Sequence, residues 1–242
     1  MNLLNNVQFD MIHYFMDMEA ISHELRVAVI LAELVSFIPK KIKANYGLSD
    51  GELRCAFYKG GRYHDVGKVA LRYPLFKAAD ELTCTTMLEI LKQHTVYGRG
   101  YLLEYADELF CCDTEKQICT DIAVYHHERY DGTGYPFGLS ADIPFAAQLC
   151  ALANNFDNYC MENSSNSGEK LTAEKAHKST VSDKGMACQN ALDCFMAAKN
   201  LIISKHCSPQ SPFGGKDMIN CENKISKDSP IHIGDNLRRF VK

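Results

Sequence analysis

The chain lacks a long hydrophobic run. The longest apolar stretch, residues 27–37, is interrupted by Glu33 and is much too short to cross a bilayer. No basic, apolar leader with a small-residue cleavage site follows Met1. We therefore expect no membrane anchor and no membrane partner, and a cytoplasmic protein.

An excess of positive charge is also missing, because the net charge is −4 at pH 7. The surface as a whole therefore does not attract nucleic acid or anionic membranes. A phosphate-bearing partner has to be held by a local site, which fits a small ligand better than a nucleic-acid polymer.

Cysteine is plentiful, with 11 residues, but the paired C-x-x-C spacing of a zinc ribbon is absent around Cys111, Cys112 and Cys119. Other cysteines, such as Cys55 and Cys150, lie inside apolar stretches, where cysteine packs as a small hydrophobic residue. We expect reduced thiols and no cysteine metal site.

Helical spacing of apolar residues dominates the rest of the chain, and the 46% hydrophobic content allows a sizeable core. Residues 9–39 predict one or two helices that end before Pro39, and a further helix begins after Ser49 or Asp50, either of which can cap it. Helices are also predicted at residues 82–91 and 187–203.

Two polar stretches set the domain limits. Residues 161–185 read as a mobile excursion, and residues 207–242 as a polar tail that is poorly ordered or holds one edge strand at 231–233. The predicted domain covers residues 1–206. We expect His177 and His206 to be surface residues.

The densest polar motif is YHHERYDGTGYP at residues 125–136. It places His126 and His127 at the end of a predicted helix, and the glycines and the proline that follow predict a shaped loop. Imidazole is the commonest side-chain metal ligand, so one interpretation is a metal site beside a glycine loop. The alternative is a helix end with two solvated histidines.

Similar residues recur upstream. Glu19 and His23 share one helix face, the doublet His64-Asp65 combines an imidazole with a carboxylate, and His94 lies on an apolar helix. Lys68, after Gly67, can turn back toward the doublet and neutralise a phosphate oxygen. Each of these motifs, taken alone, has an ordinary alternative: an exposed pair on a helix surface, a solvated helix end, or a core histidine whose hydrogen bonds are satisfied.

This series resembles the HD-GYP family of the HD phosphohydrolase superfamily, over residues 19–160. The resemblance implies an all-α fold, a helical bundle with a buried centre of two or three divalent ions, Fe or Mn, that hydrolyses cyclic di-GMP to pGpG; whether pGpG is cut further to GMP stays open. The residues that it implies as metal ligands are Glu19, His23, His64, Asp65, His94, His126, His127 and Asn154. It implies that Asp65 and Lys68 are catalytic, and that Lys68, Asp131, Gly132, Gly134, Tyr135 and Pro136 bind the substrate.

The chain departs from the family pattern after Pro144. Gln148 stands where the family has an arginine, and Asn154 stands where it has a metal-binding aspartate. A neutral amide holds a divalent ion less well than a carboxylate does, and Asp157 lies three residues further on. Three hypotheses remain: a cyclic di-GMP phosphodiesterase, a weak or inactive domain that binds the nucleotide or a signalling protein, and a phosphohydrolase acting on another nucleotide.

Overall fold

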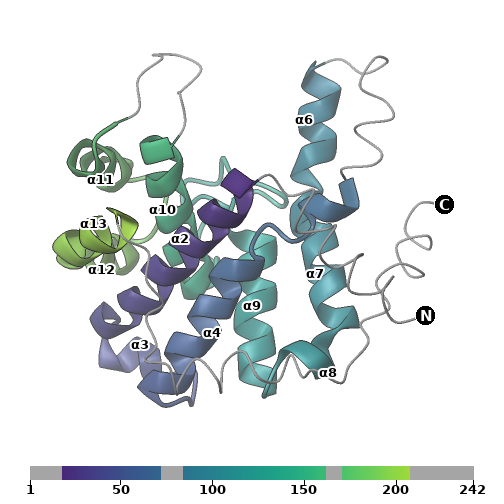
Figure 1. The fold of residues 1–242 in the computed structure, drawn as a ribbon, viewed down its shortest axis with the longest axis horizontal. Helices are drawn as coiled ribbons and strands as arrows, with labels where there is room; N and C mark the ends of the chain where they lie inside the picture. Colours follow the sequence, from purple (N-terminus) through teal and green to yellow (C-terminus); the bar gives the residue numbers. More distant parts are fainter. Residues whose placement is uncertain (1–17, 72–83, 162–170, 208–242) are drawn as a thin grey trace.

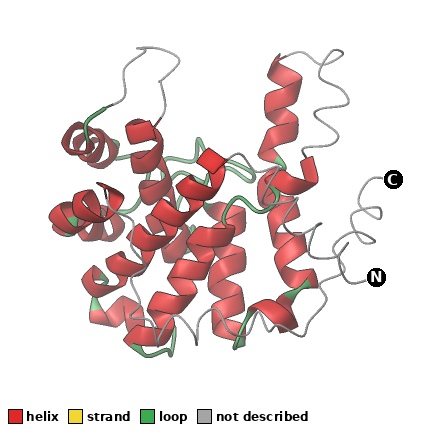
Figure 2. Cartoon of the chain, viewed as in Figure 1, coloured by secondary structure: helices red, strands yellow, loops and turns green. Residues whose placement is uncertain are grey.

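The computed structural model describes residues 18–71, 84–161 and 171–207, and every regular element within these ranges is helical (Figures 1 and 2). In chain order the elements are α2 (Met18–Leu34), the 3₁₀ helix η1 (Val35–Phe37), α3 (Lys40–Ala44), α4 (Asp50–Tyr63), α6 (Cys84–Lys92), α7 (His94–Glu104), α8 (Ala106–Leu109), α9 (Asp113–Tyr125), α10 (Phe145–Met161), α11 (Ala173–Ser182), α12 (Gln189–Ala197) and α13 (Lys199–Cys207). The predicted all-α class is confirmed.

Helix α2 lies at the centre of the bundle, where it packs against α4, α10 and α13. Its residues 27–34 are buried all round, as a helix that is apolar on every face requires. The main core gathers large side chains from three of these helices, including Ile30, Phe57 and Phe156. As predicted, helical structure ends before Pro39.

The capping prediction for α4 is confirmed at Ser49. The Ser49 hydroxyl accepts a hydrogen bond from the Glu52 backbone N–H at 3.3 Å, and the Glu52 carboxylate accepts one from the Ser49 N–H at 2.9 Å. This reciprocal capping box fixes the start of α4. The helix then runs fourteen residues to the predicted His-Asp doublet.

A second apolar cluster joins α7, α8 and α9 through Leu102, Tyr105, Leu109 and Cys119. Helix α9 packs against both α4 and α7. The C-terminal ends of α4 and α9 and the N-terminal end of α7 consequently lie at the same end of the bundle (Figure 1). Three predicted histidine motifs are carried on these ends.

The expected irregular excursion at residues 161–185 is wrong over residues 173–182, which form α11. Thr172 caps this helix, and its buried stripe of Ala176, His177 and Thr180 packs inward. His177 is therefore not a surface residue: its Nε2 lies 3.1 Å from the Phe195 carbonyl oxygen, and its ring stacks on the Phe195 ring. Polar composition described only the outer face of α11.

Two helices, α12 and α13, occupy the segment predicted as helical from residue 187 to 203. Residues 162–170 and the predicted tail, including the edge strand at 231–233, lie outside the described residues. Cys119, Cys150 and Cys194 are buried thiols without a disulfide. Cys55 is disulfide-bonded, so the expectation of reduced thiols fails there. Within the described helices, none combines the length and apolar content that crossing a bilayer requires.

Candidate metal centre

The His-Asp doublet follows the last residue of α4 and is buried. His64 and Asp65 are 0% and 3% exposed. The Nδ1 atom of His64 lies 2.7 Å from the Gly61 carbonyl oxygen, which accepts a hydrogen bond from it. The Nε2 atom of the same ring therefore has a free lone pair. Lys68 turns back as predicted, and its Nζ donates to Asp65 Oδ2 at 2.5 Å.

His94 is the first residue of α7 and faces Asp65. Its Nδ1 lies 2.7 Å from the Leu91 carbonyl oxygen, and its Nε2 lies 3.2 Å from Asp65 Oδ1. Gly67 makes this approach possible, because a β-carbon there would overlap the His94 carbonyl group. The glycine between Asp65 and Lys68 therefore lets the end of α4 rest directly on the start of α7.

His126 and His127 end α9 as the sequence predicts. The Nδ1 atom of His126 lies 3.0 Å from the Ile122 carbonyl oxygen. Its Nε2 lies 3.6 Å from Asp65 Oδ1 and 3.4 Å from His94 Nε2. Ring nitrogens from α7 and α9 thus converge on one oxygen of the doublet.

Six of the predicted ligands form two groups with metal-binding geometry. One contains Asp65, His94, His126 and His127, the other contains His23, His64 and Asp65, and the ligand atoms of each lie within 4.8 Å of one another. Asp65 belongs to both. Its Oδ1 faces His94 and His126, while its Oδ2 lies 3.4 Å from His64 Nε2.

These residues fit divalent metal ions. His64 Nε2 and Asp65 Oδ1 are buried without a hydrogen-bond partner in the described structure, although buried polar atoms normally have one. The backbone carbonyls that hold the Nδ1 atoms of His64, His94 and His126 fix the tautomer that ligation through Nε2 requires. A mixed imidazole and carboxylate set suits divalent transition metals.

The electrostatics produce the protonation states that ligation needs. Burial lowers the pKa of His126 to about 4, against the opposing effect of the nearby Asp65 carboxylate, and burial also holds the pKa of His127 well below its usual range. Burial alone would raise the pKa of Asp65, but His64, Lys68 and His126 together lower it. At neutral pH the imidazoles of His126 and His127 are neutral and Asp65 is ionised, so no proton competes with an ion at these groups.

The remaining predicted ligands are placed less completely. Glu19 lies in the first turn of α2, and its side chain is outside the described residues. Asn154 is buried on α10, where its Oδ1 accepts a hydrogen bond from Asn158 Nδ2 at 3.3 Å. Asp157 is no substitute ligand, because hydrogen bonds from three side chains occupy its two oxygens.

The glycine loop is built by a buried carboxylate that sequence reasoning left without a role. Glu128, 1% exposed, accepts hydrogen bonds from the backbone N–H groups of Phe137 at 2.6 Å and Leu139 at 2.9 Å. Gly132 has φ +79°, and a β-carbon on Gly134 would lie 2.6 Å from the Glu128 Cα. Both glycines are needed for this conformation.

The loop brings Tyr135 onto the histidines. The Tyr135 backbone N–H donates to the His127 carbonyl oxygen at 3.1 Å, and the two rings stack with centroids 4.6 Å apart. The peptide bond between Tyr135 and Pro136 is cis. An aromatic ring therefore forms one wall of the four-residue cluster.

Asp131 is occupied within the loop and its surroundings. Its oxygens accept hydrogen bonds from the Arg129 guanidinium and from Thr133, and these bonds lower its pKa. Arg129 also donates twice to Asp183 at 2.9 Å, which ties the loop to the segment after α11. The contacts of Asp131, which is predicted to bind substrate, hold the loop together.

Two further residues show what sequence patterns do not reveal. Gln148, which replaces the family arginine, donates to the Ile143 carbonyl oxygen at 2.8 Å and accepts from the Cys188 N–H at 2.7 Å, so it joins chain segments. Glu24, beside His23, is 4% exposed. Burial raises its pKa to about 8, with Asp65 adding to the rise and Arg62 opposing it. No motif marks Glu24, because its burial depends on the packing of α2.

Comparison with known proteins shows the family to which this chain is similar and several relatives. A family model described as an HD domain matches residues 50–186. A probable cyclic di-GMP phosphodiesterase of Vibrio cholerae is 37% identical over 106 residues, which are 42% of this chain and 23% of that protein. A cyclic di-GMP phosphodiesterase of Thermotoga maritima is 30% identical over 152 residues, 61% of this chain and 36% of that protein.

A third relative has a different substrate in its name. A 3′3′-cGAMP-specific phosphodiesterase of Vibrio cholerae is 33% identical over 113 residues, 46% of this chain and 20% of that protein. The matched part thus spans well under half of the length of each of these relatives, 23%, 36% and 20%.

Proposed function

Because the chain belongs to the HD domain family, whose model matches residues 50–186, we propose that it is a metal-dependent phosphodiesterase that hydrolyses cyclic di-GMP to pGpG and further to GMP. The observation that carries the proposal is the pair of ligand groups that share Asp65. A cyclic dinucleotide is supported by the names of the similar proteins.

Two divalent ions fit the two groups, and iron or manganese suits the nitrogen and oxygen donors. When bound, such ions supply an activated water and stabilise charge on a phosphoryl group. A third ion, with Glu19 as an added ligand, belongs to the same proposal. Asn154 is the candidate ligand on α10 that would complete the group of His23, His64 and Asp65.

The residues of this chain have separate roles in the proposal. Asp65 presents one oxygen to each group, so it sets the spacing between the two sites. Lys68 is 43% exposed while its Nζ stays at Asp65, which puts a positive charge at the edge of the centre, where it can contact a phosphate oxygen. Its exposure is what lets substrate reach it.

The glycine loop forms the nucleotide side of the site in this proposal. Tyr135 offers an aromatic face next to His127, and Gly132, Gly134 and Pro136 shape the backbone around it. Asp131 contributes to substrate binding by holding the loop in shape through Arg129 and Thr133, and not by contacting the nucleotide base. A bacterial, cytoplasmic enzyme without a nucleic-acid or membrane partner belongs to the same proposal, and the bacterial relatives support its origin.

Two alternatives are kept for specific reasons. The similarity to a 3′3′-cGAMP-specific enzyme favours a test of that dinucleotide. The neutral Asn154 in place of a carboxylate favours a domain that binds the nucleotide, or a signalling protein, with little turnover.

The test is hydrolysis of cyclic di-GMP and of 3′3′-cGAMP by protein purified without chelator, with product chromatography and elemental analysis. We expect pGpG from cyclic di-GMP, formed faster than any product of 3′3′-cGAMP, and loss of activity after chelation. Faster cleavage of 3′3′-cGAMP would reassign the substrate. Metal-loaded protein that binds cyclic di-GMP without cleaving it would support the binding domain and overturn the enzyme.

A further inference from the structure

Asp157 is a fully buried carboxylate on α10 with a saturated set of partners. Its Oδ1 accepts from Arg26 Nε at 2.6 Å and from His206 Nε2 at 2.8 Å. Its Oδ2 accepts from Arg26 Nη2 at 2.9 Å and from His23 Nδ1 at 2.6 Å. Four hydrogen bonds from three side chains therefore converge on the two oxygens of Asp157.

One of these bonds reaches the metal centre. Because the Nδ1–H of His23 donates to Asp157, the Nε2 atom of that ring has the free lone pair, and His23 is grouped with His64 and Asp65. The ligands His64, His94 and His126 are held through Nδ1 by backbone carbonyls of their own helix or turn. His23 is held by a carboxylate, which depends on other side chains for its own position.

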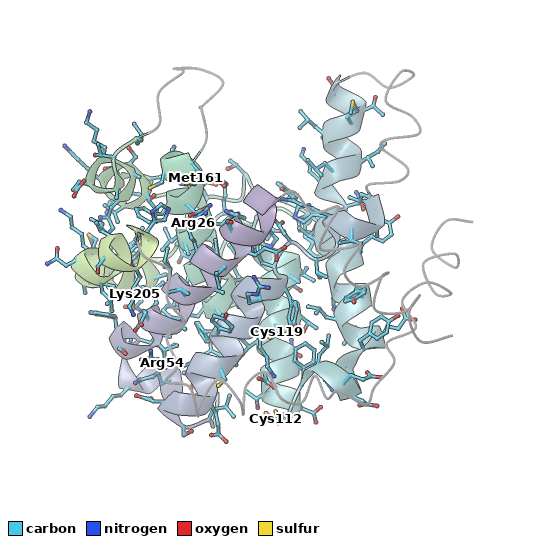
Figure 3. The ribbon with its side chains drawn as sticks, viewed as in Figure 1. Arg26, Arg54, Cys112, Cys119, Met161 and Lys205 are labelled. Carbon is cyan, nitrogen blue, oxygen red and sulfur yellow. The ribbon has the colours of Figure 1, made fainter. Side chains whose placement is uncertain are left out.

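His206 supplies that support from a distant part of the chain. It lies on α13, beyond the residues 50–186 that match the HD domain model, and its side chain is 10% exposed. Helix α13 packs against α2, and Figure 3 labels Arg26 on α2 and Lys205 on α13. The sequence prediction that His206 is a surface residue is therefore wrong.

The neighbouring residue provides an internal comparison. Lys205 Nζ lies 3.3 Å from Glu33 Oε1, so it also joins α13 to α2, but Glu33 belongs to neither ligand group. Two adjacent side chains of one helix thus make separate contacts with the bundle. Only the His206 contact continues to a candidate ligand.

We propose that His206 is a positioning residue, which orients the His23 imidazole toward the metal ion through the Asp157 carboxylate. Such carboxylate–histidine contacts fix the ring and raise its basicity, and losing one typically weakens metal binding about 10- to 100-fold. This proposal rests on the metal centre of the proposed function. It makes α13 part of the site rather than an appended helix.

The test compares His206→Phe, His206→Gln and Lys205→Ala. The Phe variant keeps a ring against Phe156, whose centroid is 5.1 Å from that of His206, and removes the donor to Asp157. The Gln variant keeps a donor and removes the ring. The measurements are Mn²⁺ titration of each metal-free protein by calorimetry and the Mn²⁺ spin-resonance spectrum, which separates coupled ion pairs from single ions.

We expect one of the two ions to bind several-fold to about tenfold more weakly to the Phe variant, the low end of the range for such contacts because Arg26 still holds Asp157, with loss of the coupled-pair signal. The Gln and Lys205→Ala variants should keep the parent affinities. Parent affinities in the Phe variant, equal weakening in all three variants, or a Phe variant that does not fold would each overturn the role. Absence of Mn²⁺ binding to the parent protein would instead overturn the metal centre itself.

Discussion

Replacing Gly67 by Ala should separate the two halves of the metal centre without changing the side chain of a candidate ligand. The added β-carbon would lie 2.8 Å from the His94 carbonyl carbon and closer still to its oxygen, whereas ordinary contacts begin at 3.4 Å. The start of α7 must then move by at least the difference, 3.4 − 2.8 = 0.6 Å. Metal sites tolerate deviations of about 0.2 Å in their ligand distances.

His94 would therefore leave the group that contains His126 and His127, while His23 and His64 stay with Asp65. We expect the ion of the four-residue group to bind about tenfold or more weakly, and the other ion to be retained. The overlap should also lower the free energy of unfolding of the metal-free protein by about 1–3 kcal/mol. Calorimetric Mn²⁺ titration and urea unfolding in chelator measure the two effects.

Gly100→Ala is the matched control, because Gly100 lies on the same helix and an added β-carbon there would meet nothing within 4 Å. It should keep both ions and gain up to about 1 kcal/mol from the higher helix propensity of Ala. If Gly67→Ala binds both ions with parent affinity, the close approach of the two helix ends does not position His94, and the reasoning fails.

Three further substitutions test other parts of the account. Asn154→Asp restores a carboxylate with almost no change in volume, and cyclic di-GMP hydrolysis at limiting Mn²⁺ should rise about tenfold, or about 1.4 kcal/mol; an unchanged rate would show that the amide suffices. Glu24→Gln removes a carboxyl whose pKa is raised to about 8 by burial, so the unfolding free energy of the parent should fall from pH 5 to pH 8 by at most about 5 kcal/mol, and that of the variant should fall less. Urea unfolding in chelator at several pH values measures this, and an equal fall of the unfolding free energy with pH in both proteins would refute it. Gly134→Ala should weaken binding of cyclic di-GMP, because its β-carbon would displace the backbone of Glu128, and parent affinity in a nucleotide titration would contradict the loop assignment.

The sign of the Glu24 effect follows from the direction of its shift. The carboxyl is neutral in both states below its usual value of 4.5, so it has no effect there. Above that pH it ionises in the unfolded chain but stays protonated in the folded protein until about pH 8, and the folded state is disfavoured progressively across this range.

Sequence reasoning brought out the candidate ligands because their motifs are local. His64 and Asp65 are neighbours, and His126 and His127 end one helix. The resemblance to the HD-GYP family indicated that these separate motifs belong to one site. The helical spacing of apolar residues over 9–39 predicted one or two helices with a buried face that end before Pro39, and α2 is such a helix over the part that the structure describes.

Contacts between distant segments could not be read in the same way. His206 reaches Asp157 across 49 positions, and Arg129 reaches Asp183 across 54, so each pairing depends on how whole helices pack. The burial of His177 was missed for a related reason: the helix that carries it is polar on its outer face, and composition averages both faces. The periodicity of apolar residues shows which face of a helix is buried, but it does not show which other element covers that face.

The most direct test of the central claim, two ions held by two groups that share Asp65, is the Mn²⁺ stoichiometry of the parent protein and three variants. The account predicts two ions for the parent, one each for His23→Ala and His127→Ala, and none for the nearly isosteric Asp65→Asn. Two ions retained by Asp65→Asn, or loss of both ions in either histidine variant, would contradict it.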